Sequence, residues 1–314
     1  MQSNRKKVIF LGYVALVLCV LAVSASFAWM SISSTPTVTD LALSVVSDNR
    51  LEVAPDNEGK PGVWSSILGL TEESELAAPL KPVTFDARDN SFYEPGYGLD
   101  GRTNFSNASR LTDGNGKLLA DKDSSPIYTC DFWIRSGASY CSVGLTPAVV
   151  RENGELGNGT FVVGEPVWNE KTFRHDEAGN GSEKAVRVAL RIEGNGAEPT
   201  QWIIYEPCAE ENRQTTGISG SPLQGNNRLI RQKTSEWTES SPILKDTVIY
   251  KSGDFIDNVN GLFDLEPGIS KHVTLYLWIE GQDPDCTNAI SGGRIFANLQ
   301  FNGELNNPAG LKPE

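Results

Sequence analysis

Three carboxylates lie close together near the C-terminal end of the chain, in a stretch that also contains a glycine and a proline. They are Glu280, Asp283 and Asp285. Carboxylate oxygens on turns are ligands that Ca²⁺ prefers in proteins, so this stretch is a candidate calcium site, although its spacing is not that of an EF-hand. A chain with 40 acidic residues also forms such clusters in ordinary solvated turns. The sequence leaves both interpretations open, and no other cofactor is expected.

The chain has few histidines that could serve in catalysis or metal binding. Only two histidines occur: His175 lies in a polar stretch, and His272 opens an expected strand after Pro267 and Gly268. We find no nucleophile elbow, no zinc-protease motif and no phosphate-binding glycine loop. The sequence therefore predicts that the protein is not an enzyme.

Five cysteines are present, and Cys19 lies in the apolar N-terminal run. The other four allow two disulfides in an oxidising compartment, in any of three pairings, or they remain buried thiols. These four are Cys130, Cys141, Cys208 and Cys286.

Two of the seven tryptophans, Trp133 and Trp278, each lie between apolar neighbours in an expected strand. Successive side chains of a strand point to opposite faces, so each ring lies on the other face from those neighbours. That face either belongs to a second packed layer or is open to solvent, where aromatic rings bind sugars.

The formal net charge of −13 excludes nucleic acid as a partner. Nucleic acids are bound through Lys and Arg side chains that contact phosphates, and a chain this acidic is repelled from them. A high negative charge is instead typical of a solvated surface outside the cell.

The N-terminus carries an export signal. Arg5, Lys6 and Lys7 precede an uncharged, mostly apolar run from Val8 to Met30. Small residues place signal-peptidase sites after Ala25 and after Ala28, but the run is also long enough to cross a bilayer as a helix. Residues 1–30 are therefore a cleaved signal peptide or a retained transmembrane anchor, and residues 31–314 are exported.

Apolar residues alternate with polar ones in many short segments separated by Gly, Pro, Asn and Asp, which is typical of β-strands. We expect an all-β fold, an antiparallel β-sandwich of jelly-roll type, with long polar loop insertions near 54–123 and 208–240. A Ser-Gly-Ala-Ser turn at 136–139 predicts a hairpin between 127–135 and 140–145. The other expected strands are 37–46, 50–53, 160–163, 184–192, 201–205, 247–250, 262–265, 272–279 and 293–301.

Both ends of the chain carry a family resemblance. Ser26-Phe-Ala-Trp-Met30, followed by Thr37-Val-Thr-Asp-Leu-Ala-Leu-Ser-Val45, resembles the export signal and first strand of the TasA and camelysin family of Gram-positive surface proteins. Residues 275–288 and 292–301 are similar to the closing strands of related exported proteins. The resemblance implies a jelly-roll-like sandwich, processing by a dedicated signal peptidase and, for some members, polymerisation into biofilm matrix fibres.

Export and the first strand together predict a structural protein of the cell surface or extracellular matrix. Its subunits would self-associate into filaments when residues 37–46 complete a neighbour's sheet, with Leu41, Leu43 and Val45 filling pockets. The same strand can equally pair within its own chain. The alternative function is a membrane-anchored surface adhesin or glycan-binding module, held by an uncleaved 8–30 helix.

Overall fold

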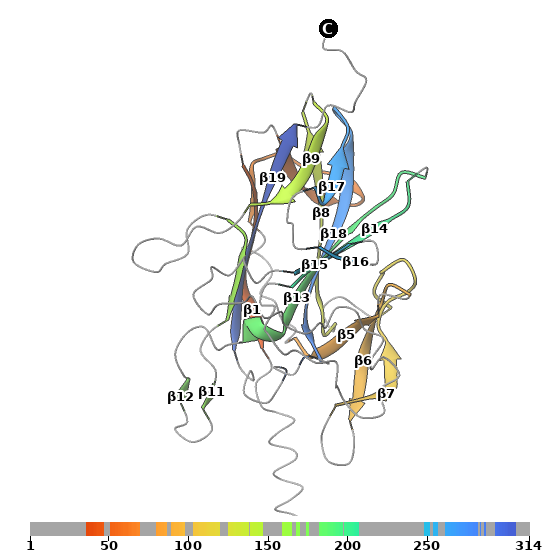
Figure 1. The fold of residues 1–314 in the computed structure, drawn as a ribbon, viewed down its shortest axis with the longest axis vertical. Helices are drawn as coiled ribbons and strands as arrows, with labels where there is room; N and C mark the ends of the chain where they lie inside the picture. The colour runs from red at the N-terminus through yellow and green to blue at the C-terminus, as the bar shows by residue number, and fades with distance from the viewer. Residues whose placement is uncertain are drawn as a thin grey trace, which may run out of the picture.

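The computed structural model describes the chain in segments. They are residues 36–46, 51–69, 80–86, 89–97, 103–119, 125–137, 139–146, 159–164, 168–169, 174–175, 182–196, 198–206, 248–251, 254–256, 261–281, 283, 286 and 293–305. Within these segments the fold is all-β, and the only helical turn is a 3₁₀ turn, η3, at Ser182–Ala185 (Figure 1). These segments include no helix long and apolar enough to cross a membrane. The predicted signal or anchor at 1–30, with its cleavage sites at Ala25 and Ala28, lies outside them.

Six strands form the first sheet, sheet A, and β19 is its longest member. In order across the sheet they are β17 (Phe263–Leu265), β9 (Cys141–Leu145), β19 (Arg294–Leu305), β1 (Thr37–Val45) and β4 (Ile67–Gly69), and β10 (Phe161–Gly164) also pairs with β19. The β1 strand runs parallel to β19, whereas the other pairs are antiparallel.

Eleven strands form the second sheet, sheet B, which branches at β18. One path runs through β16 (Asp254–Ile256), β15 (Val248–Lys251), β14 (Gln201–Glu206), β13 (Val186–Ile192), β18 (Ser270–Glu280), β5 (Pro82–Asp86), β6 (Ser91–Tyr97) and β7 (Thr103–Arg110). The other leaves β18 through β8 (Tyr128–Ser136), β2 (Leu51–Asn57) and β3 (Lys60–Pro61). A separate pair joins β11 (Trp168–Asn169) to β12 (Arg174–His175).

The main hydrophobic core contains side chains from both sheets. Leu43 and Phe301 come from sheet A, and Phe132 and Leu275 come from sheet B; all four are 0% exposed. Side chains alternate between the two faces of a strand, so every second residue of β18 from Val273 onward faces this core.

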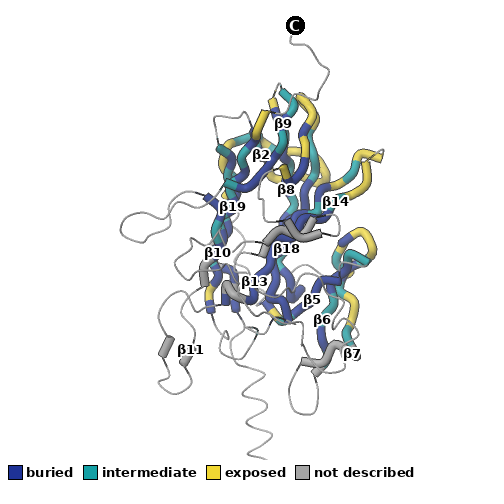
Figure 2. The backbone as a smooth tube through the Cα atoms, viewed as in Figure 1, coloured by how far each residue is buried: buried dark blue, intermediate teal, exposed yellow. Residues whose placement is uncertain are grey.

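A second hydrophobic core packs against the other face of sheet B. Trp278 and Tyr276 of β18 contact Phe92 of β6, and Phe85 of β5 contacts Trp202 of β14. Most of β18 is therefore buried on both faces (Figure 2). The covering strands β5 and β6 arise in residues 54–123, for which the sequence predicted long polar loops with short strands between them.

The strands predicted by alternation are present wherever the structure describes them, but two predictions about their pairing are wrong. The sheets are mixed, since β1 pairs with β19 and β5 pairs with β18 in parallel. The predicted hairpin is also absent, because β8 belongs to sheet B and β9 to sheet A. Its turn closes locally, with the Ser136 hydroxyl donating to the Ser139 carbonyl (2.7 Å), but it carries the chain from one sheet to the other.

The connection from β17 to β18 makes the reverse crossing beside this turn. Ser136 bridges to Pro267, and the Gly268 amide donates to the Ser136 carbonyl (3.1 Å). At both crossings, the strands before and after the turn place their apolar side chains in the main core from opposite sheets. Apolar and polar residues therefore alternate along the sequence as they would in a hairpin. A turn signal alone does not distinguish the two arrangements.

Candidate functional site

The predicted assembly strand, β1, lies within its own chain's sheet. Leu41, Leu43 and Val45 are 1%, 0% and 5% exposed and pair with Ala297, Leu299 and Phe301 of β19. Of the two alternatives left open by the sequence, own-chain pairing is the one present in this structure.

A short segment after β3 closes the other side of β1. Residues 67–69 form β4, which pairs with β1, and the Val45 amide donates to the Ser66 carbonyl (2.9 Å). Ser65 exchanges two backbone hydrogen bonds with Val53 of β2 (2.8 and 2.9 Å). This segment therefore joins the edge of sheet A to the edge of sheet B. Its strand, β4, is only three residues long.

The predicted calcium ligands that the structure describes lie in the interior. Glu280 is 0% and Asp283 is 4% exposed, so they are not in a solvated turn. The Asp283 carboxylate accepts a hydrogen bond from the guanidinium of Arg187 at 2.6 Å, and the Trp278 indole N–H donates to Glu280 at 3.2 Å. Asp285 lies outside the described residues. Among those described, no group of three or more His, Cys, Asp or Glu side chains is arranged to hold a metal ion, and the calcium site stays a prediction.

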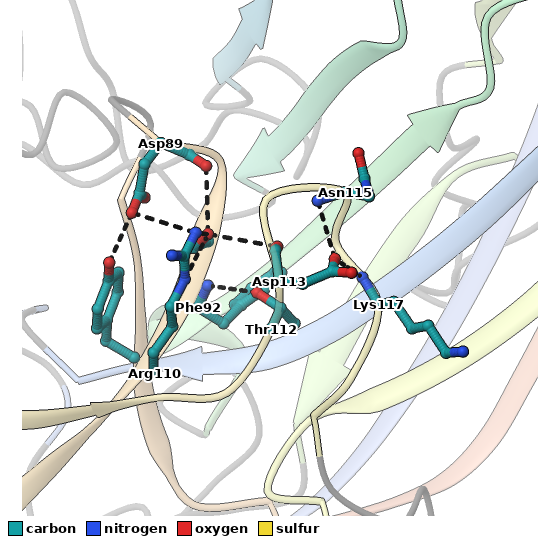
Figure 3. A network of polar contacts seen from close by, with 9 residues as sticks. Asp89, Phe92, Arg110, Thr112, Asp113, Asn115 and Lys117 are labelled. Carbon is teal, nitrogen blue, oxygen red and sulfur yellow. Dashed lines mark hydrogen bonds and ion pairs between the residues drawn. The ribbon is translucent and has the colours of Figure 1, made fainter.

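A second acidic turn, at Asp113, is used for local structure. The Asp113 carboxylate accepts the backbone N–H groups of Asn115 (2.8 Å) and Lys117 (2.9 Å), as Figure 3 shows. The hydroxyl of Tyr276 then donates to the Gly116 carbonyl (2.7 Å), which anchors the turn over the second core. Gly116 has a positive φ of 82°, a conformation that favours glycine.

Beside this turn, Arg110 connects β7 to β6. Its guanidinium donates to the Ser91 hydroxyl, and the Thr112 hydroxyl accepts the backbone N–H of Phe92 at 2.9 Å (Figure 3). Arg110 also forms an ion pair with Asp89 (3.5 Å), which accepts a hydrogen bond from the Tyr93 hydroxyl at 2.6 Å. Burial and then this hydrogen bond raise the pKa of Tyr93 to about 12.

Replacing Tyr93 by phenylalanine is expected to change how the stability and the absorbance of the protein depend on pH above pH 10. The raised pKa of Tyr93 means that its contribution to stability is complete below the ordinary tyrosine value of 10.0 and is lost as the pH rises to about 12. Absorbance at 295 nm should show that Tyr93→Phe lacks an ionisation near pH 12 that the wild type has. Burial raises the pKa of Tyr276 further, so Tyr276 should not contribute in this range. An unchanged absorbance curve would contradict the assignment.

The described cysteines lie on different elements. Cys130 is buried in β8 of sheet B, Cys141 is buried in β9 of sheet A, and Cys286 packs partly buried against the main core. Cys141 carries a free thiol, and burial raises its pKa, which keeps it protonated and unreactive. Cys141 is a buried thiol in this structure, Cys208 lies outside the described residues, and the disulfide pairing stays a prediction.

The sequence did not single out a polar and aromatic surface on the outer face of sheet B. The register places Trp133 of β8 between Ala54 of β2 and His272 of β18. In the next row Asp131 lies opposite Thr274, and its carboxylate accepts the threonine hydroxyl at 2.7 Å. We call this surface the Trp133 face, and define it as Trp64, Asp131, Trp133, Arg135, Glu193 and His272.

Carboxylates surround His272 on this face. Its Nδ1 lies 3.0 Å from the Glu193 carboxylate, and its Nε2 lies 3.7 and 3.8 Å from Asp56 and Asp131. The imidazole packs on the Trp133 ring with a centroid distance of 4.9 Å. His272 is thus a fixed part of this surface, near the start of β18, the longest strand of sheet B.

Each aromatic ring of the Trp133 face is held by a charged partner. The Trp133 indole N–H donates to Asp56 at 2.7 Å. The Arg135 guanidinium lies 4.1 Å from the centre of the Trp64 ring and donates to Glu52 through Nε (2.7 Å) and Nη2 (2.6 Å). Alternation within 127–135 would group 131, 133 and 135 on one face. His272, Glu193 and Trp64 come from distant segments, and alternation within one strand cannot show that they join this face.

The sequence matches no protein-family model, and comparison with curated proteins and with solved structures found no match either. The resemblance to TasA and camelysin therefore stays a prediction from the two motifs that carry it.

Proposed function

We propose that this chain is an exported structural protein of the cell surface or extracellular matrix, and that its subunits join by exchanging β1. Export rests on the cationic and apolar N-terminal run at residues 5–30. We also interpret the two sheets and their shared core as a β-sandwich of jelly-roll type.

The position of β1 is the observation that carries the proposal. On one side β1 makes a parallel ladder with β19 from Thr37 to Val45, and on the other its partner among the described residues is the short β4. Its departure would leave β19 with an unpaired edge and would open the main core at Leu43. A strand of the same sequence from a neighbouring copy supplies the backbone partners and the side chains that fit this gap.

Strand exchange costs little at equilibrium, because the contacts within the closed chain and between exchanged copies are the same. The balance then depends on the linker between β1 and β2 and on protein concentration. If each copy donates β1 to the next and accepts β1 from the previous one, the contact is head-to-tail and grows into an open filament.

A charge at Leu43 is a poor test of exchange, since Leu43 is fully buried in the chain's own core and Leu43→Glu would unfold the subunit as well. A disulfide across the ladder leaves the core intact. Ser44 and Gln300 are paired residues of β1 and β19, and the Gln300 amide donates to the Ser44 hydroxyl at 3.3 Å.

We expect Ser44→Cys/Gln300→Cys to form covalent oligomers in assembled material. In an exchanged filament the two new cysteines belong to neighbouring subunits, so oxidation gives a ladder of dimers, trimers and larger species on a non-reducing gel. Electron microscopy of the same material should show filaments. The wild type and Ser44→Cys alone, oxidised in parallel, control for the native cysteines.

Two results would contradict the proposal. One is filaments in which the double variant cross-links only within single chains, because assembly would then use another contact. The other is a uniform monomer at every concentration examined.

A further inference from the structure

We propose that the Trp133 face is a glycan-binding site. The proposal is independent of strand exchange, because the face lies on the outer side of sheet B, whereas β1 belongs to sheet A. It rests on three properties of the face: fixed aromatic rings, exposed hydrogen-bonding groups beside them, and the sign of its charge.

The rings are fixed before any ligand arrives. Trp133 and Trp64 are partly exposed, and each is held by the partners described above: Asp56 and His272 for Trp133, and Arg135 for Trp64. A sugar ring presents an apolar face of C–H groups that packs on the electron-rich face of an indole. Because the indoles are already ordered, binding loses little side-chain entropy.

Polar groups that can bind hydroxyls lie next to the rings and remain open to solvent. The side chains of Asp131, Glu193 and Arg135 are 40%, 51% and 35% exposed. Each sugar hydroxyl both donates and accepts, so it can donate to a carboxylate while accepting from the guanidinium. A few fixed polar groups beside apolar surface are what gives such a site its orientation and specificity.

The charge of the face argues against anionic occupants. Asp56, Asp131 and Glu193 surround His272, and the Arg135 charge is already paired with Glu52. Phosphates and other anions are repelled by these carboxylates. An uncharged polyhydroxylated ligand meets no such penalty.

His272 is a positioning residue in this site. It supports the Trp133 ring from one side, and its bond to Glu193 fixes that carboxylate beside the ring. His272→Phe keeps a ring against Trp133 but removes the bond to Glu193, so it should weaken glycan binding less than loss of the Trp133 ring does.

The test uses the full chain in mild detergent on an array of neutral oligosaccharides that includes β-1,4-glucans, chito-oligosaccharides and mannans. The strongest binder is then titrated while tryptophan fluorescence is followed. We expect Trp133→Ala to weaken binding at least about tenfold, as loss of a central aromatic contact does. Trp133→Phe should restore part of the affinity, and Asp131→Asn should weaken binding without changing the melting temperature.

Val63→Ser is the matched control, because Val63 is 83% exposed and outside the face; its affinity should equal that of the wild type. Two outcomes would overturn the proposal: a folded wild type that binds no glycan on the array, or a folded Trp133→Ala variant that binds as tightly as the wild type.

Discussion

Replacing Arg187 by methionine is expected to lower the free energy of unfolding by about 3–5 kcal/mol, which for a typical domain is a large share of its total stability. Arg187 is 0% exposed, and its guanidinium lies 2.6 Å from the carboxylate of Asp283, which is also buried. Without the arginine, a carboxylate stays in the interior without its opposite charge. Chemical denaturation of Arg187→Met against the wild type measures the loss.

Two further variants separate the buried pair from a general surface effect. Arg187→Met/Asp283→Leu removes both partners of this ion pair and should be more stable than Arg187→Met alone, since Asp283 no longer leaves a charge in the interior. Glu198→Gln breaks the Lys271 pair, in which Glu198 is 45% exposed, and should cost less than about 1 kcal/mol. A loss below 1 kcal/mol for Arg187→Met would show that the pair does not hold β13 to the end of β18.

Replacing Gly303 by alanine is expected to destabilise the protein by about 1–3 kcal/mol. A methyl group on Gly303 of β19 would overlap the buried sulfur of Cys141 in β9 and would lie 3.1 Å from Leu51. Sheet A therefore requires glycine here because of a neighbour's side chain. Thermal or chemical denaturation of Gly303→Ala gives the size of the effect.

A double-mutant cycle with Cys141 identifies the cause. Cys141→Ala removes the sulfur, so Gly303→Ala should cost less in that background than in the wild type. Gly69 of β4 is the matched control, because a methyl group there meets nothing within 4 Å, and Gly69→Ala should be neutral or slightly stabilising. If the cost of Gly303→Ala is the same with and without the Cys141 sulfur, the overlap is not its origin.

Trp133 and Trp278 show what a sequence pattern predicts and where it stops. Both rings occupy the same phase relative to their apolar neighbours, yet Trp278 is fully buried and Trp133 is partly exposed. Alternation shows on which face of a strand a side chain lies. Distant segments of the chain decide whether that face is covered. Here Phe85 of β5 and Phe92 of β6 cover Trp278, and the sequence predicted long loops with short strands in that region.

The carboxylates at 280–285 show the same limit for a candidate site. Their clustering is visible in the sequence, but the environment of Asp283 depends on Arg187, which lies 96 residues away. The pairing of Arg187 with Trp278 in the β13–β18 ladder brings this guanidinium to the end of β18. The packing of the whole sheet sets the register between distant strands, so this register cannot be predicted from a local motif.

The parallel pairing of β1 and β19 also decides how the subunit would carry a pulling force. The ladder runs from Thr37 opposite Arg294 to Val45 opposite Phe301, and β19 continues to Leu305. Tension between the start of β1 and the end of β19 would enter at one end of the ladder and leave at the other, so it would shear the strands along their length. All the backbone hydrogen bonds of the ladder would then resist together, whereas an antiparallel pair pulled from neighbouring ends would open one bond at a time.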